Sequence, residues 1–125
     1  MEIGWRVRGN VLLLRLEGEF DLRTAEQFRR VADEALENEK VRHVILNLRG
    51  VSFLDSSGIG AILGRYKRLR KNAGVMILVG ITPQILPVLE ISGIIRLLPV
   101  YDSEAAALGA LEGGNGFVGG KQVQA

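Results

Sequence analysis

Hydrophobic and polar residues alternate along the first part of the chain, which is typical of β-strands with one covered face. Residues 3–7 and 11–16 predict two strands, and Gly9-Asn10 between them is a suitable hairpin turn. The segment 18–21, Gly-Glu-Phe-Asp, is expected to leave the sheet. The chain therefore begins with a β-hairpin.

The spacing of apolar residues then changes to the helical period. It predicts an amphipathic helix over 24–38, which begins with a capping box of Thr24 and Gln27. Residues 41–48 and 75–79 are nearly continuous apolar runs, as expected for strands that are covered on both faces. A helix separates these two strands, so they are expected to run parallel.

The C-terminal third alternates between further helix and strand signals. Thr82-Pro83 resembles a helix start, so we expect a helix over 82–92 that is bent at Pro87. Residues 96–100 predict a short edge strand, because Pro99 limits its pairing. A last helix is expected over 104–111.

These elements predict the fold class and the domain organisation. The fold is an α/β fold with an open mixed, mostly parallel β-sheet, packed by about four α-helices. Residues 1–112 form one domain, and the glycine-rich stretch 113–125 is expected to be a flexible tail. Ligand and partner sites in such sheets lie beyond the carboxyl ends of the strands.

One turn stands out at such a strand end. The strand end 52–54 runs into Asp55-Ser56-Ser57-Gly58, and a helix with a single apolar stripe follows. Either Asp55 or Ser56 can serve as the N-cap of this helix. Asp21 follows another strand, so it is expected near Asp55 at the same edge.

Three glycines lie in the first turns of this helix. Gly58, Gly60 and Gly64 each cost the helix up to about 1 kcal/mol relative to alanine. A serine at a helix start is in most cases only a cap. The glycines favour a second interpretation, in which another molecule approaches the turn closely.

Composition and charge narrow the classes of function. The 125 residues carry a net charge of +2 and 6% aromatic residues, which favours neither a nucleic-acid patch nor base stacking. There is no cysteine, so disulfides and thiolate chemistry are excluded. No signal peptide is evident, and the longest apolar run, 75–81, is far shorter than the roughly 20 residues that span a bilayer. We expect a cytoplasmic protein without membrane contact.

Three other chemistries fit the residues poorly. A serine hydrolase would need G-x-S-x-G and a histidine, but the first glycine is missing and the sole histidine, His43, precedes the site by a whole strand. The glycines at 58, 60 and 64 miss the dinucleotide spacing, so only a weak nucleotide contact stays open and no cofactor is expected. Asp21 and Asp55 alone make a poor metal site. The basic run 65–71 fits a solvated helix end better than a nucleic-acid surface.

A serine that another enzyme modifies fits better. Phosphorylation adds about −1.5 to −2 charges, and Asp55, with Asp21 nearby, would oppose them. Two unit charges about 5 Å apart repel by roughly 3 kcal/mol at an effective dielectric constant of about 20. A partner seated over the serine would then lose affinity on the order of 100-fold.

These residues resemble the STAS-domain anti-sigma factor antagonists, in particular those of the sporulation sigma-F system. The resemblance covers about residues 3–112 and rests on five stretches: Gly18–Asp21 with Thr24–Glu26, Arg42–Leu48, Ser52–Gly60, Ile62–Lys67 and Ser92-Gly93. The Asp-Ser-Ser-Gly turn with its helix is its most specific part.

The resemblance implies a STAS domain and a non-enzymatic function. Such proteins bind an anti-sigma factor that is also a serine kinase, and so release a sigma factor. The kinase phosphorylates the serine after the aspartate, here Ser56, and a PP2C-type phosphatase restores it. The other residues expected to contact the partner are Asp21, Asp55, Ser57, Gly58, Ile59 and Gly60. Related systems of stress response stay open as alternatives.

Overall fold

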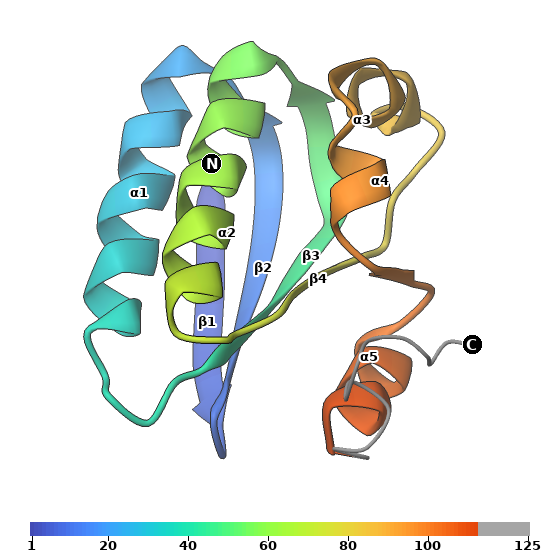
Figure 1. The fold of residues 1–125 in the computed structure, drawn as a ribbon. Coiled ribbons are helices and arrows are strands. Elements are labelled where there is room, and N and C mark those ends of the chain that lie inside the picture. The colour runs from blue at the N-terminus through green and yellow to red at the C-terminus, as the bar shows by residue number, and fades with distance from the viewer. Residues whose placement is uncertain (113–125) are drawn as a thin grey trace.

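A computed structural model describes residues 1–112 of the chain and shows one five-stranded sheet with five helices (Figure 1). The strand order is β1-β2-β3-β4-β5, with β1 antiparallel to β2 and all other neighbours parallel. The elements are β1 (Glu2–Arg8), β2 (Val11–Phe20), α1 (Leu22–Leu36), β3 (His43–Leu54), α2 (Ser56–Lys71), β4 (Met76–Val79), α3 (Leu86–Ser92), α4 (Ile94–Leu97), β5 (Val100–Tyr101) and α5 (Glu104–Glu112). The predicted open, mostly parallel α/β sheet is confirmed, and the tail predicted over 113–125 lies outside the described residues.

Two boundaries in the first half differ from the sequence prediction. β2 continues through residues 18–20 as the neighbour of β3 instead of leaving the sheet. α1 begins at Leu22 because Asp21 is its N-cap and Thr24 completes the capping box. The predicted box of Thr24 with Gln27 is therefore wrong, and the Gln27 amide instead donates to the carbonyl of Met1 at 2.8 Å.

The C-terminal third holds the other corrections. The backbone of Thr82 and Pro83 forms a turn instead of a helix start, and α3 begins only at Leu86. Pro87 then lies in the first turn of α3, where a missing N–H does no harm, so it does not bend the helix. The strand predicted over 96–100 is mostly wrong: its first two residues belong to α4, and only Val100–Tyr101 pair with β4.

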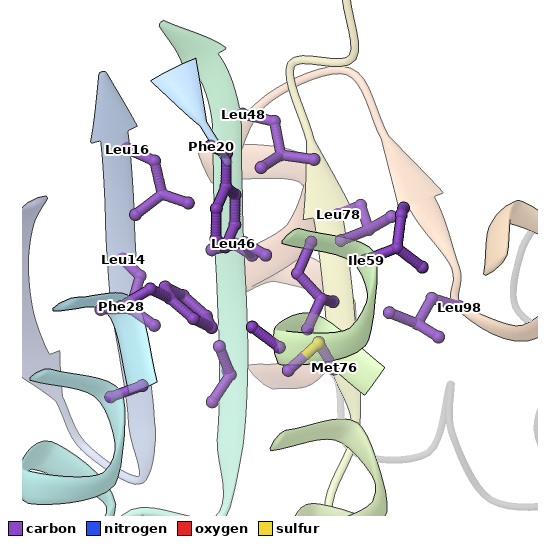
Figure 2. Packing of buried hydrophobic residues seen from close by; sticks show 14 of the residues in the cluster. Leu14, Leu16, Phe20, Phe28, Leu46, Leu48, Ile59, Met76, Leu78 and Leu98 are labelled. Carbon is purple, nitrogen blue, oxygen red and sulfur yellow. The ribbon is translucent and has the colours of Figure 1, made fainter. Parts of the chain in front are cut away.

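The hydrophobic core has two parts, one on each face of the sheet. The larger part lies between the sheet and the helices α1 and α2, where Phe20 and Phe28 pack with ring centroids 5.0 Å apart (Figure 2). The smaller part lies under α5, where Ala107 and Leu108 cover Ile45 and Ile77. β3 and β4 are thus covered on both faces, which explains why their sequences do not alternate.

A polar network fixes α5 to the sheet. Arg15 of β2 donates to both carboxylate oxygens of Glu104 at 2.8 and 2.7 Å, and the Asn47 amide donates to the same group at 2.7 Å. The Arg15 guanidinium, helped by Asn47, lowers the pKa of Glu104 to about 2. Glu104 therefore stays ionised and holds α5 in place over the second face.

Candidate functional site

The carboxyl ends of β2 and β3 lie side by side, and each leads directly into a helix. Phe20 pairs with Leu54 in the parallel register, so the next residues, Asp21 and Asp55, are neighbours at one edge of the sheet. The N–H of Asp55 donates to the carbonyl of Phe20 at 3.4 Å across this edge. Helices α1 and α2 start at this same end of the molecule (Figure 1). The expectation that Asp21 lies near Asp55 is confirmed.

Each of these aspartates caps its helix. Asp55 has an extended backbone, and one carboxylate oxygen accepts from the N–H groups of Ser57 and Gly58 at 2.9 and 3.2 Å. Asp21 accepts from the N–H of Thr24 at 3.1 Å, and this bond holds the pKa of the Asp21 carboxyl below its ordinary value. Of the two caps that the sequence left open for α2, the structure selects Asp55.

Ser56 is consequently free of a capping role. It occupies the first helical position and its residue is exposed. Within residues 1–112 its hydroxyl has no protein partner, because Asp55 already holds the free N–H groups of this turn. Ser57 is half-buried and its N–H is one of the donors to Asp55. Of the two serines, Ser56 is the one that a second protein can reach.

The glycines and Ile59 divide into an inner and an outer set. A Cβ on Gly58 would lie 2.6 Å from Leu54 Cδ1 and 3.0 Å from the carbonyl oxygen of Phe20, so this glycine serves close packing within the domain. Ile59 is only 6% exposed and belongs to the core. A Cβ on Gly60 would meet nothing within 4 Å, and the residue is exposed. A second molecule could therefore approach the backbone closely at Gly60. The prediction that Gly58 also serves such an approach is wrong, because Gly58 is needed for packing inside the domain.

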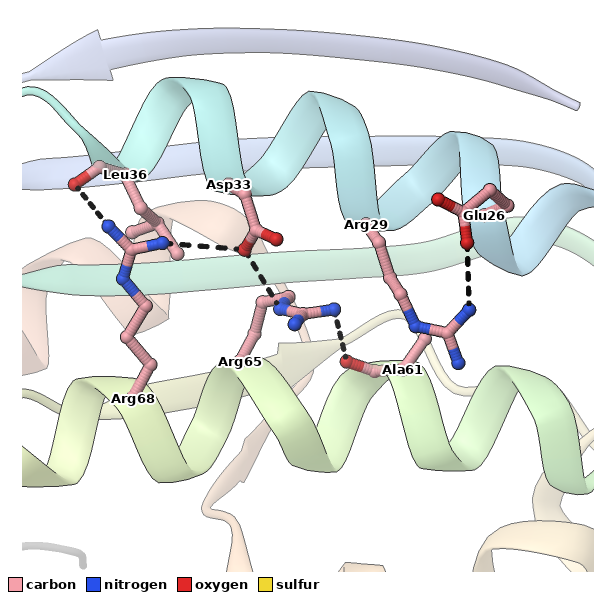
Figure 3. Close-up of polar contacts among 7 residues, drawn as sticks. All are labelled: Glu26, Arg29, Asp33, Leu36, Ala61, Arg65 and Arg68. Carbon is pink, nitrogen blue, oxygen red and sulfur yellow. Dashed lines mark hydrogen bonds and ion pairs between the residues drawn. The ribbon is translucent and has the colours of Figure 1, made fainter.

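An ionic contact holds α1 and α2 side by side below the two turns. Asp33 of α1 forms an ion pair with Arg65 Nε at 3.1 Å and accepts a hydrogen bond from Arg68 Nη1 at 3.4 Å, as Figure 3 shows. Arg68 also donates to the carbonyl of Leu36 at 3.3 Å, and so meets the C-terminal end of α1. Part of the basic run 65–71 thus faces α1 instead of solvent, whereas Lys67, Arg70 and Lys71 are exposed as expected.

His43 lies at the opposite end of β3 from Ser56. The strand between them has 12 residues, or roughly 36 Å of extended chain. The Nδ1 atom of His43 accepts from the N–H of Val75 at 3.0 Å, and burial lowers the pKa of the imidazole. The geometry excludes a catalytic pair of His43 and Ser56.

Two exposed apolar side chains flank the turn and were not singled out from the sequence. Leu22, directly after Asp21, is 73% exposed, and Phe53, two residues before Asp55, is 48% exposed. For Phe53 the signal is strand alternation, because Phe53 and the buried Leu54 point to opposite faces of β3. Together with Gly60, Leu22 and Phe53 give the edge around Ser56 an apolar component.

The surroundings contain little that would hold a small ligand. A polar hollow lies at the other end of the domain, lined by residues such as Asn10, Glu37 and Arg42, and not at Ser56. Among residues 1–112, no group of three histidine, cysteine or acidic side chains could hold a metal ion. Over the same residues, no helix is both long and apolar enough to cross a membrane. The site is an exposed edge instead of a cavity.

Comparisons with known proteins agree with this geometry. The STAS domain family matches residues 3–107. An anti-sigma F factor antagonist of Paenibacillus polymyxa is 40% identical over 102 residues, which cover 82% of this chain and 87% of that protein.

Two solved structures are also similar. The anti-sigma factor antagonist SpoIIAA in its unphosphorylated form matches with a TM-score of 0.72 and 30% identity, over 90% of this chain and 99% of that one. The Bacillus cell fate determinant SpoIIAA in its phosphorylated form matches with a TM-score of 0.70 and 31% identity, over 88% and 99%. The chain therefore belongs to the STAS domain family, in which the relatives named above are anti-sigma factor antagonists.

Proposed function

We propose that this protein is an anti-sigma factor antagonist that is switched by phosphorylation of Ser56. In its unmodified form it binds an anti-sigma factor that is also a serine kinase, and a sigma factor is released. The observation that carries the proposal is the exposed Ser56 hydroxyl at the start of α2, left without a structural role because Asp55 caps the helix. The function of the similar anti-sigma factor antagonists supports the same assignment.

The switch follows from the charges at the turn. The N–H groups of Ser57 and Gly58 already donate to Asp55. A phosphate on Ser56 would therefore not compete for them, and the helix start is expected to keep its structure. It would instead add its negative charge beside Asp21 and Asp55, where a docked partner must desolvate it. Modification therefore acts on the partner's affinity and leaves the fold in place. The similar match of this chain to both forms of SpoIIAA supports this mode of action.

The proposed contact surface combines polar and apolar groups around Ser56. The exposed residues Leu22, Phe53 and Gly60 offer apolar contact, and Asp21 and Ser57 offer polar groups at the rim. The remaining partner-binding residues of the sequence prediction act indirectly. Gly58 and Ile59 are buried and pack the turn against the core, and Asp55 holds the turn in place by capping α2.

The finer identity of the system is part of this proposal. We assign the partner to the sigma-F type, which the resemblance links to sporulation, since the P. polymyxa relative is an anti-sigma F factor antagonist. A PP2C-type phosphatase would restore the bare serine, and the exposed position of Ser56 suits access by two different enzymes. The protein would act in the cytoplasm, where sigma factors bind their polymerase, and without contact to nucleic acid.

The decisive experiment is phosphorylation by the anti-sigma factor kinase of the same organism with ATP, followed by mass spectrometry. The phosphate is expected on Ser56, with Ser57→Ala as the matched control that is still modified. Ser56→Ala should bind the kinase as tightly as the wild type, and Ser56→Asp should bind about tenfold or more weakly. Modification of a different residue, or equal affinity of all variants, would overturn the proposal.

A further inference from the structure

The outer edge of β1 is a surface that the proposed function does not use. β1 is seven residues long and pairs only with β2, and no other strand within residues 1–112 covers its far side. An uncovered strand edge presents a row of free N–H and C=O groups and is a template for pairing with another chain. Such edges are commonly shielded by proline or a bulge, and β1 has neither.

The hairpin determines which backbone groups point outward. The two-residue turn at Gly9 and Asn10 is closed by the pair Arg8 and Val11, and Gly9 has the positive φ of 61° that such turns require. The closing pair of a two-residue turn bonds across the hairpin, and inward and outward residues alternate along an antiparallel strand. The N–H and C=O groups of Ile3, Trp5 and Val7 therefore face the open edge.

The sequence of β1 is complementary to itself when read antiparallel. With Trp5 at the centre, Glu2 lies opposite Arg8, Ile3 opposite Val7 and Gly4 opposite Arg6, while the two Trp5 residues face each other. This register places opposite charges at both ends, and the apolar pairs Ile3–Val7 and Trp5–Trp5 between them, while Arg6 meets the small Gly4. It also pairs all three outward residues of each strand. A shift of two residues pairs only five residues, and in one direction it sets Arg6 against Arg6.

We propose that the β1 edge binds a second copy of this chain, with the two β1 strands antiparallel and a twofold axis at Trp5. The side chains on the α1 face support this arrangement. Ile3 and Val7 pack at the margin of the core, whereas Trp5, in line with them on the strand, is 51% exposed. The pair would bring the two indole rings together at the axis, where they shield each other from water.

The charged ends of β1 are available for such pairing. Arg8 has one ionic partner in residues 1–112, Glu112, at 3.8 Å, and both side chains are more than half exposed. A contact of that length and exposure contributes little, so Arg8 can exchange it for Glu2 of the second copy. The exchange of ionic partners would therefore move only exposed side chains.

The joined sheet would have ten strands and would leave both Ser56 sites open. Because the β1 strands run antiparallel, the two carboxyl edges that carry Ser56 point to opposite ends of the assembly. A contact along one strand is small, so the association is expected to be weak and dependent on concentration. Its failure would leave the phosphorylation proposal intact, since the two use different edges of the molecule.

Charge reversal gives the sharpest test. Glu2→Arg sets arginine against Arg8, and Arg8→Glu sets glutamate against Glu2, so each variant alone should lose self-association by about tenfold or more in sedimentation equilibrium. A mixture of the two variants restores both opposite-charge pairs and should form a heterodimer. The double variant Glu2→Arg/Arg8→Glu should self-associate like the wild type. Repulsion in a different register would not give this rescue.

Trp5 supplies an independent readout, because it is the only tryptophan of the chain. On dilution of the wild type from about 1 mM to about 1 µM its emission should shift to the red as the indole becomes exposed. Val7→Pro removes an outward N–H without touching the ladder to β2, and should stay folded by circular dichroism but monomeric. A wild type that is monomeric at about 1 mM, or dimers that persist in both single charge variants, would overturn the proposal.

Discussion

The turns that begin α1 and α2 share the same aspartate cap but are closed in different ways. Both follow paired strand ends, and both are capped by an aspartate with nearly the same backbone, φ −120° and ψ −167° at Asp21 against φ −123° and ψ −172° at Asp55. At the third helical position, α1 has Thr24 and α2 has Gly58. The two caps therefore have nearly equal backbone geometry, and the third helical residue decides how each turn is closed.

Thr24 closes the first turn. Its hydroxyl bonds to the N–H of Asp21 at 2.8 Å and to the carbonyl of Glu19 at 2.7 Å, so both partners of the capping box are satisfied. Gly58 has no side chain to close the second turn, and the space it leaves is filled by Phe20 and Leu54. The α2 turn is thus held from below by packing, and its outer side, with Ser56, is left open. The first helical position differs as well: α1 has Leu22 where α2 has Ser56, so only the second turn offers a hydroxyl there that can be modified.

Substitution of the glycines in α2 should show the largest effect of this difference. Gly58→Ala places a methyl group against Leu54 and Phe20, so we expect the free energy of unfolding to fall by about 2–3 kcal/mol. Gly60→Ala, the matched control two residues later, meets open space and should raise it by up to about 1 kcal/mol. Urea unfolding of both variants measures the contrast, and equal changes would show that packing does not distinguish the two positions.

Gly60→Ala also separates stability from function. If Gly60 is kept for partner contact, the variant should be more stable and yet bind the anti-sigma factor less tightly. Calorimetric titration with the purified anti-sigma factor measures the second quantity. Unchanged binding would remove Gly60 from the contact surface without affecting the role of Ser56.

The contact that holds the two turns side by side should show the next largest effect. Asp33→Ala leaves Arg65 Nε, which is enclosed between the helices, without its anionic partner, and should lower the free energy of unfolding by about 1–2 kcal/mol. Glu26→Ala removes the exposed pair with Arg29 at 3.4 Å and serves as the control, with an expected loss below about 0.5 kcal/mol. Similar losses for the two variants would mean that enclosure of Arg65 adds nothing.

The caps themselves should differ by a smaller amount. Asp55→Ala frees two N–H groups and should lower the free energy of unfolding by about 1–2 kcal/mol. Asp21→Ala should cost less than Asp55→Ala, because the Thr24 hydroxyl still bonds to the backbone of residues 19 and 21. Thermal unfolding of the pair gives the order, and a larger loss at Asp21 would contradict it.

The sequence determines much of this arrangement through local signals. The hairpin, the buried runs of β3 and β4 and the cluster at Asp55 to Gly58 could be located because each depends on spacing and on residue type alone. The proximity of Asp21 to Asp55 followed from parallel connectivity. These features depend on residues that are close together in the chain, so they can be predicted from the sequence.

Other features depend on contacts between distant segments and could not be predicted. Whether Gly58 faces a partner or the core is decided by Phe20, which is far away in the chain, and by Leu54 beneath it. Residues 18–20 stay in the sheet only because β3 offers a neighbour there. The local signal of Thr82-Pro83 did not start a helix: the backbone forms a turn there, and α3 begins at Leu86.

The smallest expected effect lies in the titration of Asp21. Its pKa is lowered mainly by the N–H of Thr24 and in part by the threonine hydroxyl, so the stability that this carboxylate adds is fully present above its unfolded pKa and is lost as the pH falls through its folded pKa. Thr24→Ala keeps the backbone donor and removes the hydroxyl. Carbon-detected NMR titration of the variant should therefore find an Asp21 pKa slightly above that of the wild type but still below the ordinary value. A return to the ordinary value would mean that the hydroxyl, which α2 lacks at the equivalent position, is the dominant partner, and the contrast between the two turns would be greater than the backbone geometry implies.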